Sequence, residues 1–305
     1  MTAVILQILF SSLVTAGMWL YTPDLVRDDL EARYAGPPSI FMDVDGIRLH
    51  LRDTGKPDAP AIIMLHGFGS SLHTWEAWAQ ALSDRYRVIR FDLPGFGLTG
   101  PDPTGDYTDV HAEQVLAALM DQLHVPRAIL IGNSMGGRLA WSFAASHPAR
   151  VSRLVLISPD GFASPGIPYG QAMGVPMTAR LLPYVMPTLL LRASLAPAYG
   201  DPRRLTDEVV IRYRDMILAP GVRDAVLARM QQDALEDPVP VLRTLHLPVL
   251  LLWGEKDHLI PISNAADYLA VLPNAKLVTL PGLGHVPQEE QPAEALERVK
   301  AFLSR

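Results

Sequence analysis

The sequence predicts an α/β protein built on a mostly parallel β-sheet, and three observations lead to that prediction. Short apolar runs typical of strands buried on both faces recur at 61–65, 128–131, 154–157 and 249–253. A helical pattern of apolar residues directly follows one of them, at 137–145. The 305 residues, of which 49% are hydrophobic, are enough to bury a large core as one unit.

The N-terminus is a separate apolar segment. No charged side chain occurs from Met1 to Pro23, and a span of ~20 apolar residues is enough for a helix to cross a bilayer. Trp19 and Tyr21 at its end suit an interfacial aromatic belt. We therefore expect residues 1–23 to form an apolar helix that anchors the protein in a membrane.

Two other interpretations of this segment stay open. A cleaved signal peptide, with Val14-Thr15-Ala16 as its cleavage site, would make the protein periplasmic or secreted, although a positively charged first region is absent. Alternatively, the segment is an amphipathic helix that docks on the catalytic domain. The side of the membrane is open as well, because basic and acidic residues are interleaved in the predicted linker 24–38.

The first predicted parallel strands each end in a glycine-rich loop. The run 61–65 leads into His66-Gly67-Phe68-Gly69, and the run 87–91 leads into Asp92 and Pro94-Gly95. An Asp-x-Pro-Gly sequence favours a turn in which the carboxylate accepts nearby backbone N–H groups, so we interpret Asp92 as a turn residue.

The most informative stretch is Gly132-Asn133-Ser134-Met135-Gly136, directly behind the run 128–131. A strand that turns at once into a helix at a G-x-S-x-G sequence holds the serine on a sharp bend, with small neighbours that prevent collisions. We therefore expect Ser134 to be exposed as a nucleophile.

A serine hydroxyl needs an imidazole base, and the imidazole needs a carboxylate that fixes its tautomer. The strand 249–253 is followed by Gly254-Glu255-Lys256-Asp257, which offers Asp257 as the acid. The strand 275–280 leads into a loop that offers His285 as the base. The order Ser, Asp, His is one of the known chain orders of this triad.

With these motifs in place, the chain resembles an α/β-hydrolase-fold enzyme from about Ile40 to the C-terminus, most closely the serine esterases and lipases. The elbow Gly-Asn-Ser-Met-Gly-Gly, the acid motif Trp-Gly-Glu-Lys-Asp and the terminal Gly-His-Val-Pro-Gln-Glu-Glu carry the resemblance. It implies that the backbone N–H groups of Phe68 and Met135 form the oxyanion hole. It also makes Asp160 the alternative acid, since some relatives take the carboxylate from the end of that strand.

The resemblance further implies a cap. The alternation of strands and helices stops after Asp160, and residues 161–245 are rich in proline and methionine. We expect a helical cap there, with helices at 177–192, 203–218 and 222–236. The hydrolase core would then comprise residues 39–160 and 246–305.

Other polar residues have structural interpretations. We expect His66 to belong to the oxyanion loop, His258 to be a loop residue, and His73 to be a surface histidine that packs on Trp75. The nine histidines form no H-E-x-x-H or similarly spaced ligand group, so we expect no metal site. The formal net charge of −6, without a basic cluster, argues against nucleic-acid binding, and the absence of cysteine excludes thiol catalysis.

The sequence thus predicts a membrane-anchored serine hydrolase, without a cofactor, that cleaves small-molecule esters or lipids with apolar acyl or alcohol parts. The first alternative is a hydrolase of carbon–carbon bonds in ring-cleavage products, whose elbows also resemble Gly-Asn-Ser-Met-Gly-Gly. The His-Gly-Phe-Gly loop and the Val-Pro after His285 look more like esterases. The second alternative is a non-catalytic ligand receptor of the same fold.

Overall fold

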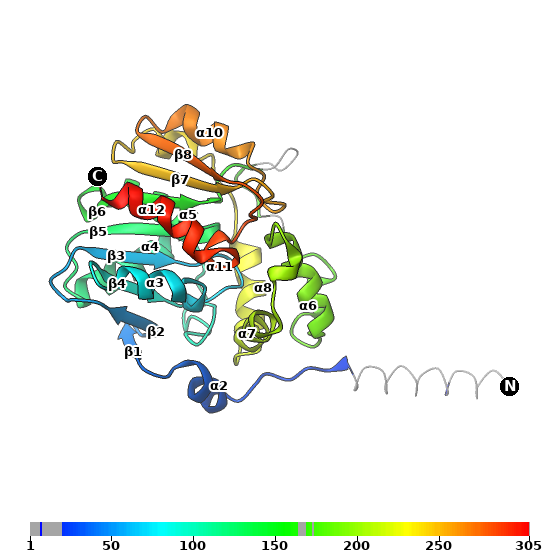
Figure 1. Ribbon diagram of the computed structural model, residues 1–305. Coiled ribbons are helices and arrows are strands. Elements are labelled where there is room, and N and C mark those ends of the chain that lie inside the picture. The colour runs from blue at the N-terminus through cyan, green and yellow to red at the C-terminus, as the bar shows by residue number, and fades with distance from the viewer. Residues whose placement is uncertain (1–6, 8–19, 164–168, 173, 305) are drawn as a thin grey trace.

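A single eight-stranded sheet forms the centre of the protein (Figure 1), seen in a computed structural model that describes residues 7, 20–163, 169–172 and 174–304. The strand order is β1-β2-β4-β3-β5-β6-β7-β8. The strands are β1 (Ser39–Val44), β2 (Ile47–Thr54), β3 (Ala61–Leu65), β4 (Arg87–Phe91), β5 (Ala128–Asn133), β6 (Val151–Ile157), β7 (Val249–Gly254) and β8 (Ala275–Leu280).

Strands β3 to β8 pair in parallel, which confirms the predicted mostly parallel sheet. The first two strands differ, because β1 pairs with β2 and β2 with β4 in antiparallel fashion. This edge hairpin was not predicted. Its second strand carries polar side chains such as His50 and Arg52 and therefore lacks the uniform apolar run of the central strands.

Helices cover both faces of the sheet, and successive strand residues pack on opposite faces. Ile62 and Met64 of β3 pack in a cluster with residues of α3 (Glu76–Leu82) and α12 (Pro292–Leu303). Ile63 and Leu65 face a second cluster, which includes residues of α4 (Asp109–Gln122), α5 (Met135–Ser146) and α10 (Asn264–Val271). Burial on both faces explains why the central strands are continuous apolar runs.

Three of the helices between β6 and β7 lie together beyond one end of the sheet (Figure 1). They are α6 (Thr188–Leu195), α7 (Asp207–Ile217) and α8 (Val222–Gln232). The short α9 (Val239–Leu242) instead packs against α5 and α10. The expected helix 177–192 forms only from Thr188, after a 3-10 turn at Ala179–Leu181. Pro183 and Pro187 explain the interruption, since proline has no N–H and disfavours helical geometry in the residue before it. The expected helix 203–218 begins at Asp207, where the Thr206 side chain caps it.

The remaining short elements are α11 (Pro287–Glu290) and the 3-10 turns Leu72–Trp75, Pro148–Arg150, Ala196–Ala198 and Pro202–Arg204. Most of the predicted apolar helix 1–23 lies outside the described residues. Among residues 20–163, 169–172 and 174–304 no helix is both long enough and apolar enough to cross a membrane.

The predicted linker 24–38 contains a folded element, the helix α2 (Arg27–Tyr34). Its Leu30 is buried in the hydrophobic core. Arg33 and Tyr34 both bond to Asp215 of α7, at 2.6 and 2.8 Å. This segment therefore packs against the cap helices instead of crossing open solvent. Some of the charged side chains that indicated a linker, such as Arg33, thus bind the cap.

Candidate active site

Ser134 occupies the bend between β5 and α5. Its φ of 55° and ψ of −122° are unusual for a residue with a side chain and cost roughly 1–3 kcal/mol. The small neighbours are required by packing: a Cβ on Gly132 would lie 2.1 Å from the carbonyl oxygen of Gly136, and one on Gly136 would lie 2.2 Å from that of Leu65. The bend leaves Ser134 partly exposed between buried residues.

His285 is paired with Asp257. Its Nδ1 lies 2.8 Å from Asp257 Oδ2, while the other carboxylate oxygen accepts the backbone N–H groups of Leu259 and Ile260, both at 2.9 Å. Burial raises the pKa of Asp257, but His285 and the Ile260 N–H outweigh burial and hold that pKa below its usual value. An ionised Asp257 fixes the proton on Nδ1 and leaves Nε2 as the basic nitrogen.

Ser134 and His285 line one cavity of about 340 Å³. They form no hydrogen bond to each other in this structure. Catalytic hydrogen bonds are often long in free enzymes and tighten when substrate binds. The loop carrying His285 is fixed by Asn133, whose side-chain amide donates to the His285 carbonyl at 2.9 Å.

The cavity is mainly apolar and continues toward the cap. Phe68, Gly69, Leu191, Ser194 and Ile217 line both this cavity and an adjacent one of about 240 Å³. Leu182, Met186, Leu190 and Val226 complete the lining of the second cavity. The two cavities are therefore adjacent, and both have mainly apolar linings.

The two predicted oxyanion donors lie next to the serine. A Cβ on Gly67 would be 3.2 Å from Ser134 Cβ, so the loop that leads to Phe68 passes directly beside the nucleophile. Met135 is the first residue of α5, and first-turn N–H groups have no partner within a helix. The helix N-terminus also favours negative charge there. The oxyanion role of these amides stays a prediction.

The carboxylate of Asp160 pairs with an arginine, whereas the acid of a triad must bond to the histidine. Its carboxylate lies 3.2 Å from Arg138 Nη1, whereas the His285 ring bonds to Asp257. Burial raises the pKa of Asp160 despite Arg138. Between the two carboxylates considered, the geometry therefore favours Asp257 as the group that orients His285.

His66 fits its structural interpretation. Its Nδ1–H donates to the Gly67 carbonyl at 2.8 Å, and its Nε2 accepts the Leu93 N–H at 2.9 Å. Both ring nitrogens are thus engaged with the backbone. His258 is exposed.

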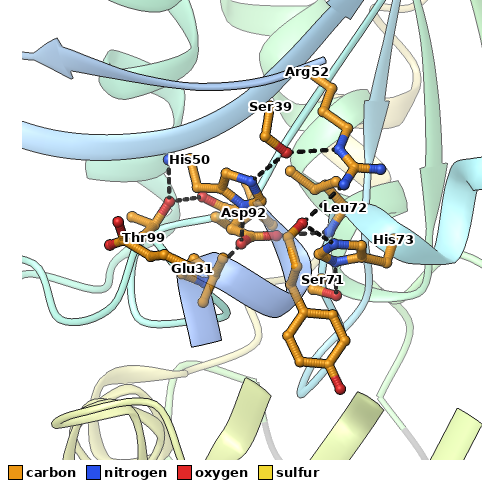
Figure 2. Close-up of polar contacts among 12 residues, drawn as sticks. Glu31, Ser39, His50, Arg52, Ser71, Leu72, His73, Asp92 and Thr99 are labelled. Carbon is orange, nitrogen blue, oxygen red and sulfur yellow. Dashed lines mark hydrogen bonds and ion pairs between the residues drawn. The ribbon is translucent and has the colours of Figure 1, made fainter. Parts of the chain in front are cut away.

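The interpretation of His73 as a surface residue is corrected by the structure. Its side chain is buried under α2, where Nε2–H donates to the Tyr34 carbonyl at 3.2 Å and Nδ1 accepts from Ser71 Oγ at 3.1 Å. Figure 2 shows this cluster, which also contains His50 and Asp92. The sequence did not show that α2 would cover this histidine.

Asp92 accepts backbone N–H groups, as the Asp-x-Pro-Gly sequence predicts. The amides of Leu72 and Leu98 donate to its two oxygens at 2.7 and 2.8 Å. It also pairs with His50 at 2.8 Å (Figure 2), a contact that the local sequence around Asp92 does not predict.

Three further residues received no functional role from the sequence, although they belong to the Pro-Gln-Glu-Glu motif that follows His285. Glu290 accepts the backbone N–H groups of Gly284, Gly200 and Asp201, at 2.7, 3.0 and 2.9 Å. It therefore ties the loop of His285 to the cap. Gln288 donates to Asn133 Oδ1 at 3.2 Å, on the other side of that loop.

Glu289 is the third missed residue and contacts the wall of the cavity. It binds Arg212 at 2.7 Å and accepts hydrogen bonds from the hydroxyl groups of Tyr199 and Tyr213, at 2.8 and 3.3 Å. Tyr213 lines the cavity that contains Ser134. Burial would lower the pKa of Arg212, but Glu289 and the tyrosines outweigh burial and raise it. The sequence gives no signal for these contacts because they join the cap to the core.

No group of three potential His, Cys, Asp or Glu metal ligands comes together within the part of the chain that the structure describes. The candidate site combines one serine, one histidine and one carboxylate beside a mainly apolar cavity. This arrangement can carry out nucleophilic acyl transfer.

Comparisons with known proteins agree with this fold. Residues 60–292 match the family model described as the alpha/beta hydrolase fold. An uncharacterized hydrolase of Bacillus subtilis is 27% identical, with 85% of this chain and 96% of that protein covered. A 2-hydroxy-6-oxononadienedioate/2-hydroxy-6-oxononatrienedioate hydrolase of Burkholderia vietnamiensis is 32% identical, with 88% of this chain and 94% of that protein covered.

Solved structures give the same result. A meta-cleavage product hydrolase from Pseudomonas fluorescens is 26% identical with a TM-score of 0.74, and the match covers 87% of this chain and 97% of that one. A bacterial membrane phospholipase A, 24% identical with a TM-score of 0.72, matches 100% of this chain and 98% of its own and shows the shared fold. The family model and the relatives together show that the chain belongs to the α/β-hydrolase family.

Proposed function

We propose that this protein is a serine hydrolase that cleaves neutral carboxylic esters with an apolar acyl or alcohol part. Ser134 attacks the ester carbonyl, and His285 takes the serine proton and gives it to the leaving alcohol. Asp257 orients His285, and the amides of Phe68 and Met135 stabilise the oxyanion. Water then hydrolyses the acyl-enzyme, with His285 again as the base. The chemistry needs no cofactor.

The observation that supports a neutral substrate is the lining of the cavity. Among the residues that the structure describes, those that line the cavity around Ser134 include no lysine or arginine. Arg212 lies on α7 next to Tyr213, but its charge is paired with Glu289. A carboxylate on the substrate would therefore lose its hydration without gaining a positively charged partner, which is unfavourable.

The second candidate is hydrolysis of carbon–carbon bonds, and the comparisons favour it. Relatives that are 28–32% identical are named as hydrolases of 2-hydroxy-6-oxo dienoates and related diacids. Their named substrates carry carboxylates. The same Ser-His-Asp arrangement is compatible with both reactions, so the two candidates differ in how the cavity would receive a negative charge.

A substrate panel separates the candidates. Purified full-length protein would be assayed with p-nitrophenyl esters of increasing acyl length and with a 2-hydroxy-6-oxo dienoate. We expect ester turnover that is lost in Ser134→Ala, with the dienoate slow or inert. Dienoate turnover faster than every ester would replace the proposal with the second candidate. A fluorophosphonate probe that failed to label Ser134 would instead support a non-catalytic receptor.

A further inference from the structure

The cap presents an exposed apolar surface near the point where the described N-terminal segment begins. The run from Leu181 to Leu191 contains no charged side chain. Its Leu189 is 77% exposed. We call the following residues the cap apolar surface, all of them large hydrophobic side chains that are exposed: Leu20, Tyr21, Met177, Leu181, Tyr184, Leu189 and Leu190.

The two parts of this surface are held side by side by backbone contacts. Tyr21 forms an antiparallel bridge with Val185, and the Thr22 N–H donates to the Tyr184 carbonyl at 2.8 Å. Arg223 of α8 fixes the same strand, because its guanidinium donates to the Thr22 carbonyl at 2.8 Å. Residues 20–23, the described end of the uncharged sequence 1–23, therefore lie at the cap apolar surface.

The cap apolar surface also adjoins the substrate cavity. Leu190 is 62% exposed and at the same time lines the smaller cavity, with Leu182 and Met186. That cavity shares residues such as Phe68 with the one that contains Ser134. The cap apolar surface thus adjoins the smaller cavity, which in turn adjoins the cavity that contains Ser134.

We propose that the cap apolar surface rests on a phospholipid bilayer, so that a lipid ester enters the cavity from the membrane. The substrate class in this proposal rests on the proposed ester hydrolysis; the docking itself does not. A bilayer is favoured over a protein partner because the surface joins an N-terminal sequence that is uncharged and long enough to span the hydrocarbon core. The exposed Arg180 beside the surface suits lipid phosphates.

The absence of cysteine from the chain allows a direct test. The full-length Leu189→Cys variant would carry an environment-sensitive fluorophore, and Val110→Cys would be the control. Val110 is 66% exposed on α4 and does not belong to the cap apolar surface. Each labelled protein would be mixed with vesicles of phosphatidylcholine and phosphatidylglycerol.

We expect a blue shift of the fluorophore at position 189 when vesicles are added, and none at position 110. No shift at either position, or an equal shift at both, would overturn the proposal. A blue shift at position 189 that grows with protein concentration without vesicles would show a second copy on the surface. A fluorophore already shifted at every concentration would show that the chain's own N-terminus covers it; either result rejects the bilayer as occupant.

Activity provides a second readout. Leu181 and Leu189 do not line either cavity at the site, so Leu181→Ser/Leu189→Ser should hydrolyse p-nitrophenyl butyrate in solution within about twofold of the original rate. Hydrolysis of a lipid ester embedded in vesicles should fall about tenfold, since less apolar area can enter the bilayer. Equal effects on both substrates would contradict membrane entry. Absence of any ester turnover would defeat the proposed function and leave the fluorescence result to decide docking.

Discussion

Ser134 combines a positive φ with a hydroxyl at the edge of an apolar cavity, a pairing that favours a functional role. If it is the nucleophile, Ser134→Ala and His285→Ala should each lower kcat by ~10⁴-fold or more. The double variant should be scarcely worse, since the two residues act as a unit. Steady-state rates with p-nitrophenyl butyrate check this, and additive losses would contradict the assignment.

Replacing each candidate acid by asparagine distinguishes the two assignments. Asp257→Asn should lower kcat by ~10⁴-fold, because an amide no longer fixes the required tautomer of His285. Asp160→Asn should retain most activity, since its carboxylate binds Arg138, which also pairs with Asp109 and Asp233. Circular dichroism would verify that both variants are folded. A larger loss in Asp160→Asn would reverse the assignment of the acid.

Glu289 offers a test of charge at the cavity wall. Glu289→Gln removes the carboxylate that neutralises Arg212 and leaves the shape of the side chain nearly unchanged. We expect the kcat/KM for an ester with a carboxylate on its acyl group to rise about tenfold relative to a neutral ester, because an uncompensated guanidinium attracts the anion. Glu297→Gln, at an exposed pair with Lys300 on α12, is the matched control. An unchanged ratio would show that Arg212 does not influence the cavity.

At the scale of secondary-structure elements, a buried polar cluster joins α2, the edge hairpin and the loops after β3 and β4 (Figure 2). His50 of β2 bridges Asp92 and Ser39, at 2.8 and 2.9 Å. Arg52 donates to Ser39 at 2.8 Å and to the Tyr34 carbonyl at 2.9 Å. The cluster fixes the C-terminal end of α2 on the core.

Asp92 gives this cluster a dependence on pH. Burial raises the pKa of Asp92, but His50 outweighs burial and holds that pKa well below its ordinary value. A carboxyl whose pKa is lower in the folded state stabilises the fold above its unfolded pKa and loses that effect as the pH falls. Asp92→Asn should therefore cost about 3 kcal/mol at pH 7. Urea unfolding should show a smaller difference at about pH 3, and a constant difference would contradict this account.

The helix α2 should contribute to stability through its one buried leucine. Leu30→Ala removes a side chain that is 2% exposed and should lower the free energy of unfolding by about 3 kcal/mol. Val26→Ala, at a 62% exposed position before the helix, is the control and should change little. Equal midpoints in urea for Leu30→Ala and the original chain would show that the segment is not docked.

These elements also show what the sequence could reveal. The central strands were predictable because their buried faces require uninterrupted apolar runs. The bend at Ser134 was predictable because G-x-S-x-G follows such a run. The helix α2 was not predictable, since its charges pair with distant partners such as Asp215. The helix expected at 177–192 was too long because Pro183 and Pro187 interrupt it. The contacts of Glu289 depend on how the cap meets the core, which no local pattern shows.

At the scale of the whole molecule, a parallel sheet positions the serine, the acid and the histidine at the ends of β5, β7 and β8, and the helices inserted between β6 and β7 close the cavity above them. In the proposed function the core supplies the chemistry, while the cap determines which substrates enter. The core residues are compatible with both candidate reactions. The proposed function is therefore best tested by comparing a neutral substrate with a negatively charged one.

The most direct measurement is the ratio of kcat/KM for p-nitrophenyl butyrate to that for the p-nitrophenyl monoester of succinate. Both acyl groups have the same number of carbons, and only the second ends in a carboxylate. In the described part of the chain, no lysine or arginine lines the cavity around Ser134. We therefore expect the butyrate to be favoured by about 100-fold, the effect of roughly 2.7 kcal/mol for an unpaired charge. Equal values, or a preference for the succinate, would contradict a neutral ester as the substrate.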